Sequence, residues 1–244
     1  MNINDKNKGK YVSAPKKYFE DRYKNRDDRW SKRDESFEIV REIELIIKEL
    51  CESKSIIHLL DIGCGRMPIS LPFIEKHNNV LAIGIDWAFN EILESYPELM
   101  SGINKTGRLR VINSDFLSFE SIPKFDIVID LGTFHHIAPI DWGTYLSSLI
   151  NLITEDGYFL LESFHVDDHN WGLSKPGGHI RKNYYCHYHN IDSIKSIFGK
   201  DFSSIKETVQ GKHWEHVVAL FKMQRRRPTK ATHKRQRWRR AENA

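Results

Sequence analysis

The fold is decided by residues 59–65, Leu59-Leu60-Asp61-Ile62-Gly63-Cys64-Gly65. The apolar residues are typical of a buried strand, and the glycines allow the backbone to turn tightly and a ligand to lie against the main chain. In an open α/β sheet, ligands bind at the carboxyl ends of the strands. The same residues also suit a plain strand–helix turn, so further signals are needed.

Outward from this stretch, strand and helix patterns alternate along the chain. Strands are expected at residues 56–62, 80–86, 109–112, 125–131, 158–164, 202–208 and 214–221. Helices are expected at residues 34–50, 68–76, 88–96, 142–153 and 191–198. The alternation predicts the α/β class, with a mostly parallel seven-stranded sheet and helices on both faces. The last two strands should form a hairpin, which makes the last strand antiparallel.

Composition and charge divide the chain into three parts. Residues 1–33 are polar with scattered aromatic residues, residues 34–223 carry the strand and helix pattern, and residues 224–244 form a basic tail that we expect to be disordered. The tail has nine Lys/Arg and one acid, a net charge of +8, and the whole chain is +4, which leaves −4 for residues 1–223. Attraction to polyanions is therefore expected of the tail and not of the domain.

Several broad classes of protein are excluded by composition. No apolar run approaches the roughly 18 residues that a membrane-spanning helix needs. The N-terminus lacks the apolar stretch of a signal peptide. The three cysteines, Cys51, Cys64 and Cys186, are scattered and odd in number, so no disulfide framework is expected. We expect a cytoplasmic protein with no membrane contact.

Two further strands are expected to end in an acid. Asp86 ends Ile83-Gly84-Ile85-Asp86 about twenty residues after the glycines, where a carboxylate can accept hydrogen bonds from the ribose hydroxyls of an adenosine. Asp115 lies in Asn113-Ser114-Asp115-Phe116, where it can contact an adenine amino group while Phe116 stacks on the ring. Each acid taken alone also suits a helix cap or a turn.

The order LLDIGCG, IGID, NSDF, FDIVIDLGTFHHI and ITEDGYFLLESF, over roughly residues 35–223, resembles the class I S-adenosylmethionine-dependent methyltransferases. It is most similar in style to bacterial small-molecule methyltransferases. The resemblance implies a Rossmann-like sheet, the cofactor S-adenosyl-L-methionine and a small-molecule methyl acceptor.

The resemblance also implies which residues bind the cofactor. Those at its methionine end would be Asp61, Gly63, Cys64 and Gly65. Asp86 would bind ribose with Trp87 beside the adenosine, and Asp115 and Phe116 would bind adenine. Asp130-Leu131, at the end of the fourth strand, would lie near the amino group and the sulfonium.

One departure from the family pattern concerns the glycines. Where a third glycine is usual, this chain has Arg66-Met67-Pro68, and Met67 adds a side chain near the cofactor's carboxylate. A non-catalytic module that binds S-adenosyl ligands therefore remains an alternative. A nicotinamide dehydrogenase is disfavoured, because its G-x-G-x-x-G fingerprint would need a glycine near Ser70-Leu71.

The acceptor side offers two candidate catalytic residues, His135 and His136, after the fourth strand. A neutral histidine there could act as a general base towards a phenol, amine or alcohol. The alternative is that one of the pair packs in the core or hydrogen-bonds to a loop carbonyl. Glu162, at the end of the fifth strand, is a weaker candidate.

Two segments could cover the acceptor. Residues 165–190 are a polar, histidine-rich insert that we expect to be a flap; Cys186-His187-Tyr188-His189 matches no closed zinc pattern, so no metal is predicted. The N-terminal aromatic residues suit either a lid over the cofactor and acceptor or padding outside the sheet. They are Tyr18, Phe19, Tyr23 and Trp30.

The tail allows non-specific nucleic-acid contact through residues 225–240, where Trp238 stands among arginines and lysines. It also suits a solvated extension with no partner. An RNA methyltransferase recruited by this tail is therefore an alternative function. Against it, Asp130-Leu131-Gly132-Thr133 stands where amino-group nucleic-acid methyltransferases often carry Asn-Pro-Pro-Tyr.

Overall fold

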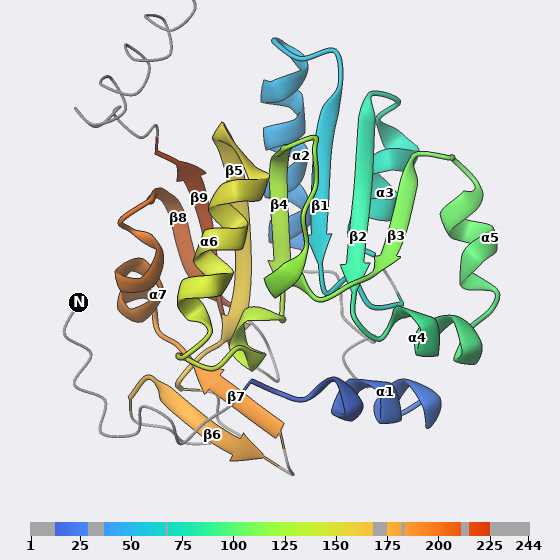
Figure 1. Cartoon of the computed structure of the whole chain (residues 1–244). Helices are drawn as coiled ribbons and strands as arrows, with labels where there is room; N and C mark the ends of the chain where they lie inside the picture. Colours follow the sequence, from blue (N-terminus) through green and yellow to red (C-terminus); the bar gives the residue numbers. More distant parts are fainter. Residues whose placement is uncertain are drawn as a thin grey trace, which may run out of the picture.

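The computed structural model describes residues 13–28, 37–66, 68–167, 175–181, 184–210 and 215–224 of the chain (Figure 1). One large sheet organises these residues. Its strands are β1 (Ile57–Ile62), β2 (Val80–Asp86), β3 (Leu109–Asn113), β4 (Phe125–Leu131), β5 (Ile153–Phe164), β8 (Phe202–Gln210) and β9 (His216–Met223). They lie in the order β3-β2-β1-β4-β5-β9-β8.

The strand directions confirm the predicted fold class. The pairs β2–β3, β1–β2, β1–β4 and β4–β5 are parallel. Strand β9 pairs antiparallel with both β5 and β8. β1 and β4 lie in the middle of the sheet and are buried on both faces, which explains why their sequences are apolar runs without alternation.

Helices cover both faces of the sheet, as Figure 1 shows. On one face α2 (Phe37–Cys51), α3 (Ser70–Lys76) and α4 (Phe89–Ser95) bury apolar residues such as Ile43 and Phe73 against the strands, with the short α5 (Leu99–Asn104) at the β3 end. On the other face α6 (Trp142–Leu152) and α7 (Ile191–Phe198) bury Tyr145 and Phe198. The two apolar layers form two cores, one on each side of the sheet.

Some predicted boundaries are wrong for identifiable reasons. The helix expected from residue 68 begins at Ser70, because the Asp61 carboxylate accepts hydrogen bonds from the Ser70 main-chain N–H and hydroxyl. The strand expected from residue 158 begins at Ile153, which pairs with Phe125 before a register shift. The pairing across this shift extends β5 back to residue 153, at which the preceding helix was expected to end.

Two unpredicted elements lie at the carboxyl edge of the sheet, below the strand ends in Figure 1. The first is helix α1 (Lys16–Lys24) in the N-terminal segment. The second is a hairpin of β6 (Gly177–Arg181) and β7 (Tyr184–Tyr188), formed by the insert that was expected to be a flap and for which no strands were predicted. Among the described residues, no helix is long and apolar enough to cross a membrane.

The hairpin and the N-terminal segment share a third, smaller apolar cluster. Tyr184, Cys186 and Tyr188 alternate along β7 and so point to one face, where they pack with Ala14 and Val166. Alternation in β7 therefore explains how a histidine-rich insert contributes a buried apolar face. Together, α1 and the hairpin cover the edge at which the sequence places its candidate site.

Candidate functional site

The parallel register brings the predicted site residues to one edge. Ile62 at the end of β1 pairs with Asp130 of β4, and Ile85, just before Asp86, pairs with Ile62 on its other side. Asp86 pairs in turn with Asn113, so the turn that carries Asp115 follows at the same edge. The strand ends that carry these acids are therefore neighbours in space.

The glycine turn after β1 requires glycine at two positions. Gly63 and Gly65 have φ angles of 63° and 57°, in the left-handed region that disfavours other residues. A Cβ atom on Gly63 would lie 1.9 Å from the Thr133 hydroxyl oxygen, and one on Gly65 would lie 3.2 Å from the Tyr23 hydroxyl. The turn therefore packs closely against Thr133, the residue before η3 (Phe134–His136), and against α1.

Asp61 and Cys64 support this turn from inside. Asp61 is buried, and one of its oxygens accepts the Ser70 main-chain N–H at 3.2 Å and the Ser70 hydroxyl at 3.1 Å. Cys64 donates its N–H to the Ile85 carbonyl at 3.0 Å, and its thiol packs towards Gly84. Burial raises the pKa of the Cys64 thiol well above its usual value, so the thiol stays protonated and unreactive.

Asp86 joins the glycine turn to the start of α4. One carboxylate oxygen accepts the Gly65 N–H at 3.1 Å, and the other accepts the Ala88 N–H at 2.9 Å. Burial raises the pKa of Asp86 to about 6, against the effect of these two hydrogen bonds. Each oxygen has a second lone pair, so the carboxylate can still accept a hydrogen bond from a ribose hydroxyl. Trp87 beside it is partly buried.

Asp115 and Phe116 have different environments in the structure. Asp115 is partly exposed, and its side chain caps η2 (Phe116–Ser118) by accepting the Leu117 N–H at 2.9 Å. Phe116 is buried in the core, with its ring centroid 4.8 Å from that of Tyr145. Phe116 therefore packs against Tyr145. Contact of Asp115 or Phe116 with adenine stays a prediction.

Asp130 is fully buried and organises the turn after β4. One oxygen accepts the main-chain N–H groups of Thr133 at 2.7 Å and Phe134 at 3.2 Å, and the other accepts the Tyr145 hydroxyl at 2.6 Å. The Thr133 hydroxyl donates to the Ile62 carbonyl at 3.3 Å. These bonds connect α6 to the glycine turn and direct Asp130 inwards, while Leu131, the predicted cofactor residue next to it, is partly buried.

The two predicted catalytic histidines contact each other. Their Nε2 atoms are 3.1 Å apart, and His136 Nδ1 is 3.1 Å from the Tyr185 carbonyl. Because a carbonyl only accepts, His136 donates through Nδ1 and its Nε2 carries the lone pair that accepts from His135. Burial lowers the pKa of His136 to about 4, which keeps the ring neutral. His135 is buried, with its ring stacked 3.9 Å from that of Phe164.

The N-terminal segment lies over these groups. The Phe19 ring centroid is 5.9 Å from that of Trp87 and 5.1 Å from that of His136, so Phe19 lies between the predicted adenosine and acceptor sides. Tyr18 stacks on Tyr184 of β7 with centroids 4.0 Å apart. The Ala14 N–H donates to the His136 carbonyl at 3.0 Å. A lid function for this segment stays a prediction, and Trp30 lies outside the described residues.

A cluster around the buried carboxylate of Asp28 connects the end of the N-terminal segment to the glycine turn. Arg66 donates to Asp28 at 2.6 Å, and Tyr96 donates its hydroxyl to the same carboxylate at 2.8 Å. The Arg66 and Arg26 guanidinium carbons lie 4.8 Å and 5.1 Å from the Tyr96 ring centroid. The sequence analysis missed Asp28, Tyr96 and Tyr145, since no local pattern links them to the motifs.

The remaining sequence predictions concern Glu162, which pairs with Leu131 at this edge of the sheet, and residues outside the description. Glu162 is buried, with an oxygen 3.8 Å from His216. Met67 and residues 225–240 lie outside the described residues. Within the described part of the chain, no group of three or more His, Cys, Asp or Glu side chains could hold a metal ion.

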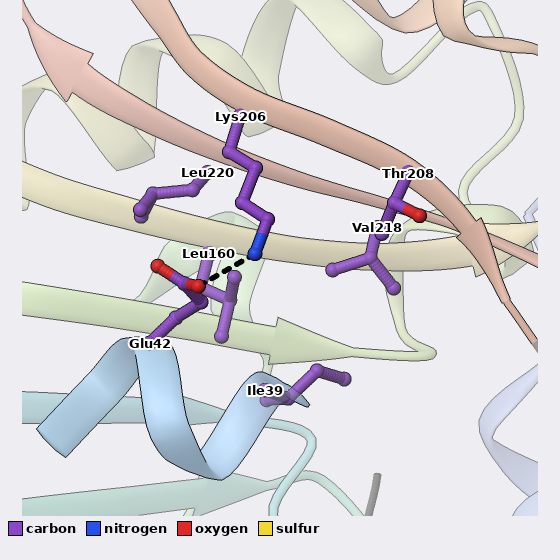
Figure 2. A pocket seen from close by; sticks show the side chains of 7 residues that line it. All are labelled: Ile39, Glu42, Leu160, Lys206, Thr208, Val218 and Leu220. Carbon is purple, nitrogen blue, oxygen red and sulfur yellow. Dashed lines mark hydrogen bonds and ion pairs between the residues drawn. The ribbon is translucent and has the colours of Figure 1, made fainter. Parts of the chain in front are cut away.

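A small cavity of about 10 Å³ lies elsewhere, between α2 and strands β5, β9 and β8 (Figure 2). Its lining is largely aliphatic, with the ion pair of Lys206 and Glu42 at 2.6 Å across it. It has room for about one water molecule and does not reach the carboxyl edge. It is therefore no part of the candidate site.

The carboxyl edge fits an S-adenosyl ligand. Gly63 and Gly65 form a turn without side chains, and Asp86 follows with lone pairs to spare. Trp87 and Asp115 are partly exposed along the same edge. Glycines that let a ligand lie against the main chain, a hydroxyl acceptor and an aromatic side chain suit the methionine, ribose and adenine parts of such a ligand.

Solved structures with the same fold include enzymes that bind this ligand. The 1,6-didemethyltoxoflavin-N1-methyltransferase of Burkholderia thailandensis, with bound 1,6-didemethyltoxoflavin and S-adenosylhomocysteine, is 17% identical and matches with a TM-score of 0.65 over 86% of this chain and 87% of that one. The magnesium protoporphyrin IX methyltransferase of Synechocystis PCC 6803, with S-adenosylhomocysteine, is 17% identical, with a TM-score of 0.61 over 85% and 99% of the two chains.

A third structure, the N-methyltransferase NodS of Bradyrhizobium japonicum WM9 with S-adenosylhomocysteine, is 15% identical and has a TM-score of 0.57 over 85% of this chain and 98% of that one. At these identities the likeness shows the shared fold. No curated protein sequence matches the chain significantly.

The sequence itself matches one family model. The match covers residues 40–216, and the model is described as mycolic acid cyclopropane synthetase. The matched range runs from α2 into β9 and includes the glycine turn, Asp86, Asp115 and both histidines. The chain therefore belongs to the mycolic acid cyclopropane synthetase family and is an S-adenosylmethionine-dependent methyltransferase.

Proposed function

We propose that the protein transfers the methyl group of S-adenosylmethionine to a small-molecule acceptor by in-line displacement. The observation that carries this proposal is the cover over the carboxyl edge, where Phe19 lies between Trp87 and His136. An acceptor that reacts beneath such a cover has to fit between the N-terminal segment and the sheet. Two of the structural neighbours carry small acceptors in their names, which supports the same proposal.

We assign the cofactor to the glycine turn and the strand ends beside it. The methionine part would lie at Asp61, Gly63, Cys64 and Gly65, with Leu131 near the sulfonium. Cys64 would contribute its main chain, because its thiol is buried. Asp86 would bind the ribose hydroxyls beside Trp87, and Asp115 the adenine. When bound, the cofactor supplies an electrophilic methyl group on a positively charged sulfur.

The chain's own contribution to the reaction is mainly orientation. Methyl transfer requires the nucleophile, methyl carbon and sulfur in line, and holding that geometry supplies much of the acceleration. His136 is the candidate group on the acceptor side. Its neutral Nε2 accepts from His135 in this structure, and it would orient an acceptor or receive a proton once that hydrogen bond is given up. His135 would act through His136, because it donates to that same atom.

Binding and transfer assays test the proposal in two steps. Calorimetry with S-adenosylhomocysteine should give binding that Asp86→Ala weakens by about 1.5–3 kcal/mol, the value of hydrogen bonds to a charged group. Equal affinity in the two proteins would exclude the ribose assignment. Binding without any methyl transfer would favour the non-catalytic alternative.

The second step uses S-adenosylmethionine with a tritiated methyl group, offered with small acceptors or with total RNA. Label in small acceptors is expected, and label only in RNA would favour the alternative of an RNA methyltransferase. His136→Ala and His135→Ala should reduce turnover with unchanged affinity for S-adenosylhomocysteine. A loss of about 10²–10⁴ would assign a general base, and a smaller loss would assign orientation.

A further inference from the structure

The side chain of Tyr185 is tightly enclosed on the β6–β7 hairpin. Tyr185 is buried, and its ring covers Gly178 of β6. A Cβ atom at position 178 would lie 2.5 Å from the Tyr185 Cε2 atom and closer still to the hydroxyl, so any other residue there would displace the ring or push the two strands apart. The φ angle of Gly178 is not in the left-handed region, so the ring and not the backbone requires this glycine.

The hydroxyl end of the same side chain is also fixed. The Tyr185 hydroxyl lies 2.6 Å from His187 Nδ1, and both side chains point to one face of β7 because they are two residues apart. The His187 ring makes an edge contact with Trp142 of α6, with the ring centroids 4.9 Å apart. The ring of Tyr185 is therefore held against β6, and its hydroxyl is connected through His187 to α6.

These contacts return to η3, which carries His136. Trp142 donates its indole N–H to the Ile137 carbonyl at 2.9 Å, and Ile137 is the residue that ends η3. At the other end of the path, the main-chain carbonyl of Tyr185 accepts the Nδ1–H of His136 at 3.1 Å. The path from η3 through β7 and α6 therefore closes on itself, and Tyr185 contributes both its carbonyl and its side chain to it.

The position of the Tyr185 carbonyl decides which nitrogen of His136 carries the proton. A carbonyl only accepts, so it keeps the proton on Nδ1 and the lone pair on Nε2, the atom that contacts His135. The Cys186 thiol lies 3.5 Å from the same Nδ1 atom, and a thiol can donate as well as accept. A displaced carbonyl would therefore leave Nδ1 beside a group that does not select one tautomer.

From these contacts, we infer that Tyr185 is a positioning residue for methyl transfer, whose enclosed side chain fixes the β7 main chain so that its carbonyl holds His136 in one tautomer and one orientation. The inference rests on the proposed function, which gives His136 its role on the acceptor side. Tyr185 acts through His136 and not on the reacting atoms. A fixed direction of the Nε2 lone pair is part of the geometry that orients an acceptor.

The test measures the tautomer of His136 directly. Long-range proton–nitrogen NMR correlations of the full chain, labelled with nitrogen-15 in its histidines, distinguish a ring protonated on Nδ1 from one protonated on Nε2. The chain has 12 histidines, so the spectrum of His136→Gln identifies the signals of His136 by their loss. We expect the wild type at neutral pH to carry the proton on Nδ1, because the Tyr185 carbonyl accepts it there.

Variants of the hairpin locate the effect. Gly178→Ala should lower the ratio of the Nδ1–H to the Nε2–H form about fivefold, the factor that one hydrogen bond contributes. Gly177→Ala is the matched control on the same strand, because the nearest atom to its added Cβ is the Lys175 carbonyl oxygen at 3.8 Å. Tyr185→Leu removes the ring without adding volume at position 178 and should act like Gly178→Ala. Tyr185→Phe keeps the ring and should restore most of the ratio.

The inference is overturned if Tyr185→Leu or a folded Gly178→Ala keeps the wild-type ratio, if Gly177→Ala changes it as much as Gly178→Ala, or if the wild type carries the proton on Nε2. Calorimetry with S-adenosylhomocysteine on the same samples should give affinities within about twofold of the wild type, because the hairpin variants leave the glycine turn intact. No binding by the wild type would overturn the proposed function, whatever the tautomer ratio. Failure of the positioning role and failure of the function are therefore read from two different measurements.

Discussion

On the β1–β2 side of the carboxyl edge, the hydrogen bonds that shape the glycine turn from within join residues nearby in sequence. On the β4 side, the N-terminal segment and the hairpin make contacts between distant segments. Asp61 and Ser70 are 9 residues apart, and Gly65 and Asp86 are 21 apart. On the β4 side, Ser13 and Ala138 are 125 residues apart. We call these the glycine side and the histidine side. The difference predicts that cofactor binding depends more on local backbone shape, and acceptor binding more on the covering segments.

The largest expected effect tests the backbone of the glycine side. Gly63→Ala should destabilise the protein by about 3 kcal/mol, because the added Cβ meets the Thr133 hydroxyl in a left-handed backbone conformation. Urea unfolding measures the change, and S-adenosylhomocysteine titration should show lost affinity.

Gly102→Ala is the matched control, because nothing lies within 4 Å of the added atom and φ there is not in the left-handed region. It should be neutral or slightly stabilising in the short helix α5. If Gly63→Ala behaves like Gly102→Ala, then the glycine turn tolerates side chains and the contrast between the two sides fails.

The next effect concerns how the free energy of unfolding depends on pH through the ionisation of Asp86. Burial raises the pKa of Asp86 from 3.8 to about 6 in the folded protein, so between these values the folded state binds more protons than the unfolded state. Stability therefore falls as pH rises from about 4 to 6, by about 2–3 kcal/mol from this group. Chemical unfolding at a series of pH values should show this slope, and Asp86→Asn should remove it.

The same carboxylate should bind a ribose better when ionised. The affinity for S-adenosylhomocysteine should therefore rise as pH increases through about 6, and Asp86→Asn should flatten that rise. Stability and affinity would then change in opposite directions with pH. A wild type whose stability and affinity are both independent of pH in this range would contradict the role of Asp86.

A smaller effect tests how the cover is attached to the glycine side. Asp28→Ala removes the acceptor shared by Arg66 and Tyr96, so the end of the N-terminal segment should open more often. We expect S-adenosylhomocysteine to dissociate about tenfold faster, a change of about 1.4 kcal/mol, measured by stopped-flow displacement.

Asp21→Ala is the matched control on the same segment. Its ion pair with Lys17 has side chains that are 50% and 70% exposed, so it should contribute little. Equal dissociation rates for Asp28→Ala and the wild type would show that cofactor release does not depend on this attachment.

The smallest expected effect on the folded site comes from the tail. Deleting residues 225–244 removes nine Lys/Arg, and it should abolish salt-dependent binding to RNA or DNA while leaving cofactor affinity unchanged. Filter binding at several salt concentrations and calorimetry measure the two quantities. A collapse of turnover in a folded, cofactor-binding deletion variant would instead assign the tail to substrate recruitment and favour RNA as the acceptor.

The glycine side could be predicted from sequence because its determinants are local. An apolar run followed by an acid and two glycines already implies a strand, a tight turn and a ligand edge, and the later acids follow their own strands. The parallel register then needs no further information to bring the strand ends together. Even so, burial of Phe116 against Tyr145 was not predictable, because it depends on where α6 packs.

On the histidine side the sequence determined the residue types, and tertiary structure decided their roles. The sequence places His135 and His136 after β4, but the Tyr185 carbonyl, which selects the His136 tautomer, belongs to a hairpin 49 residues away. The N-terminal aromatic residues suited a lid or padding equally well, and only the packing of α1 shows that Phe19 lies beside His136. The physical reason is that side-chain contacts between distant segments depend on how those segments pack. The periodicity of residue types along the chain does not contain this information.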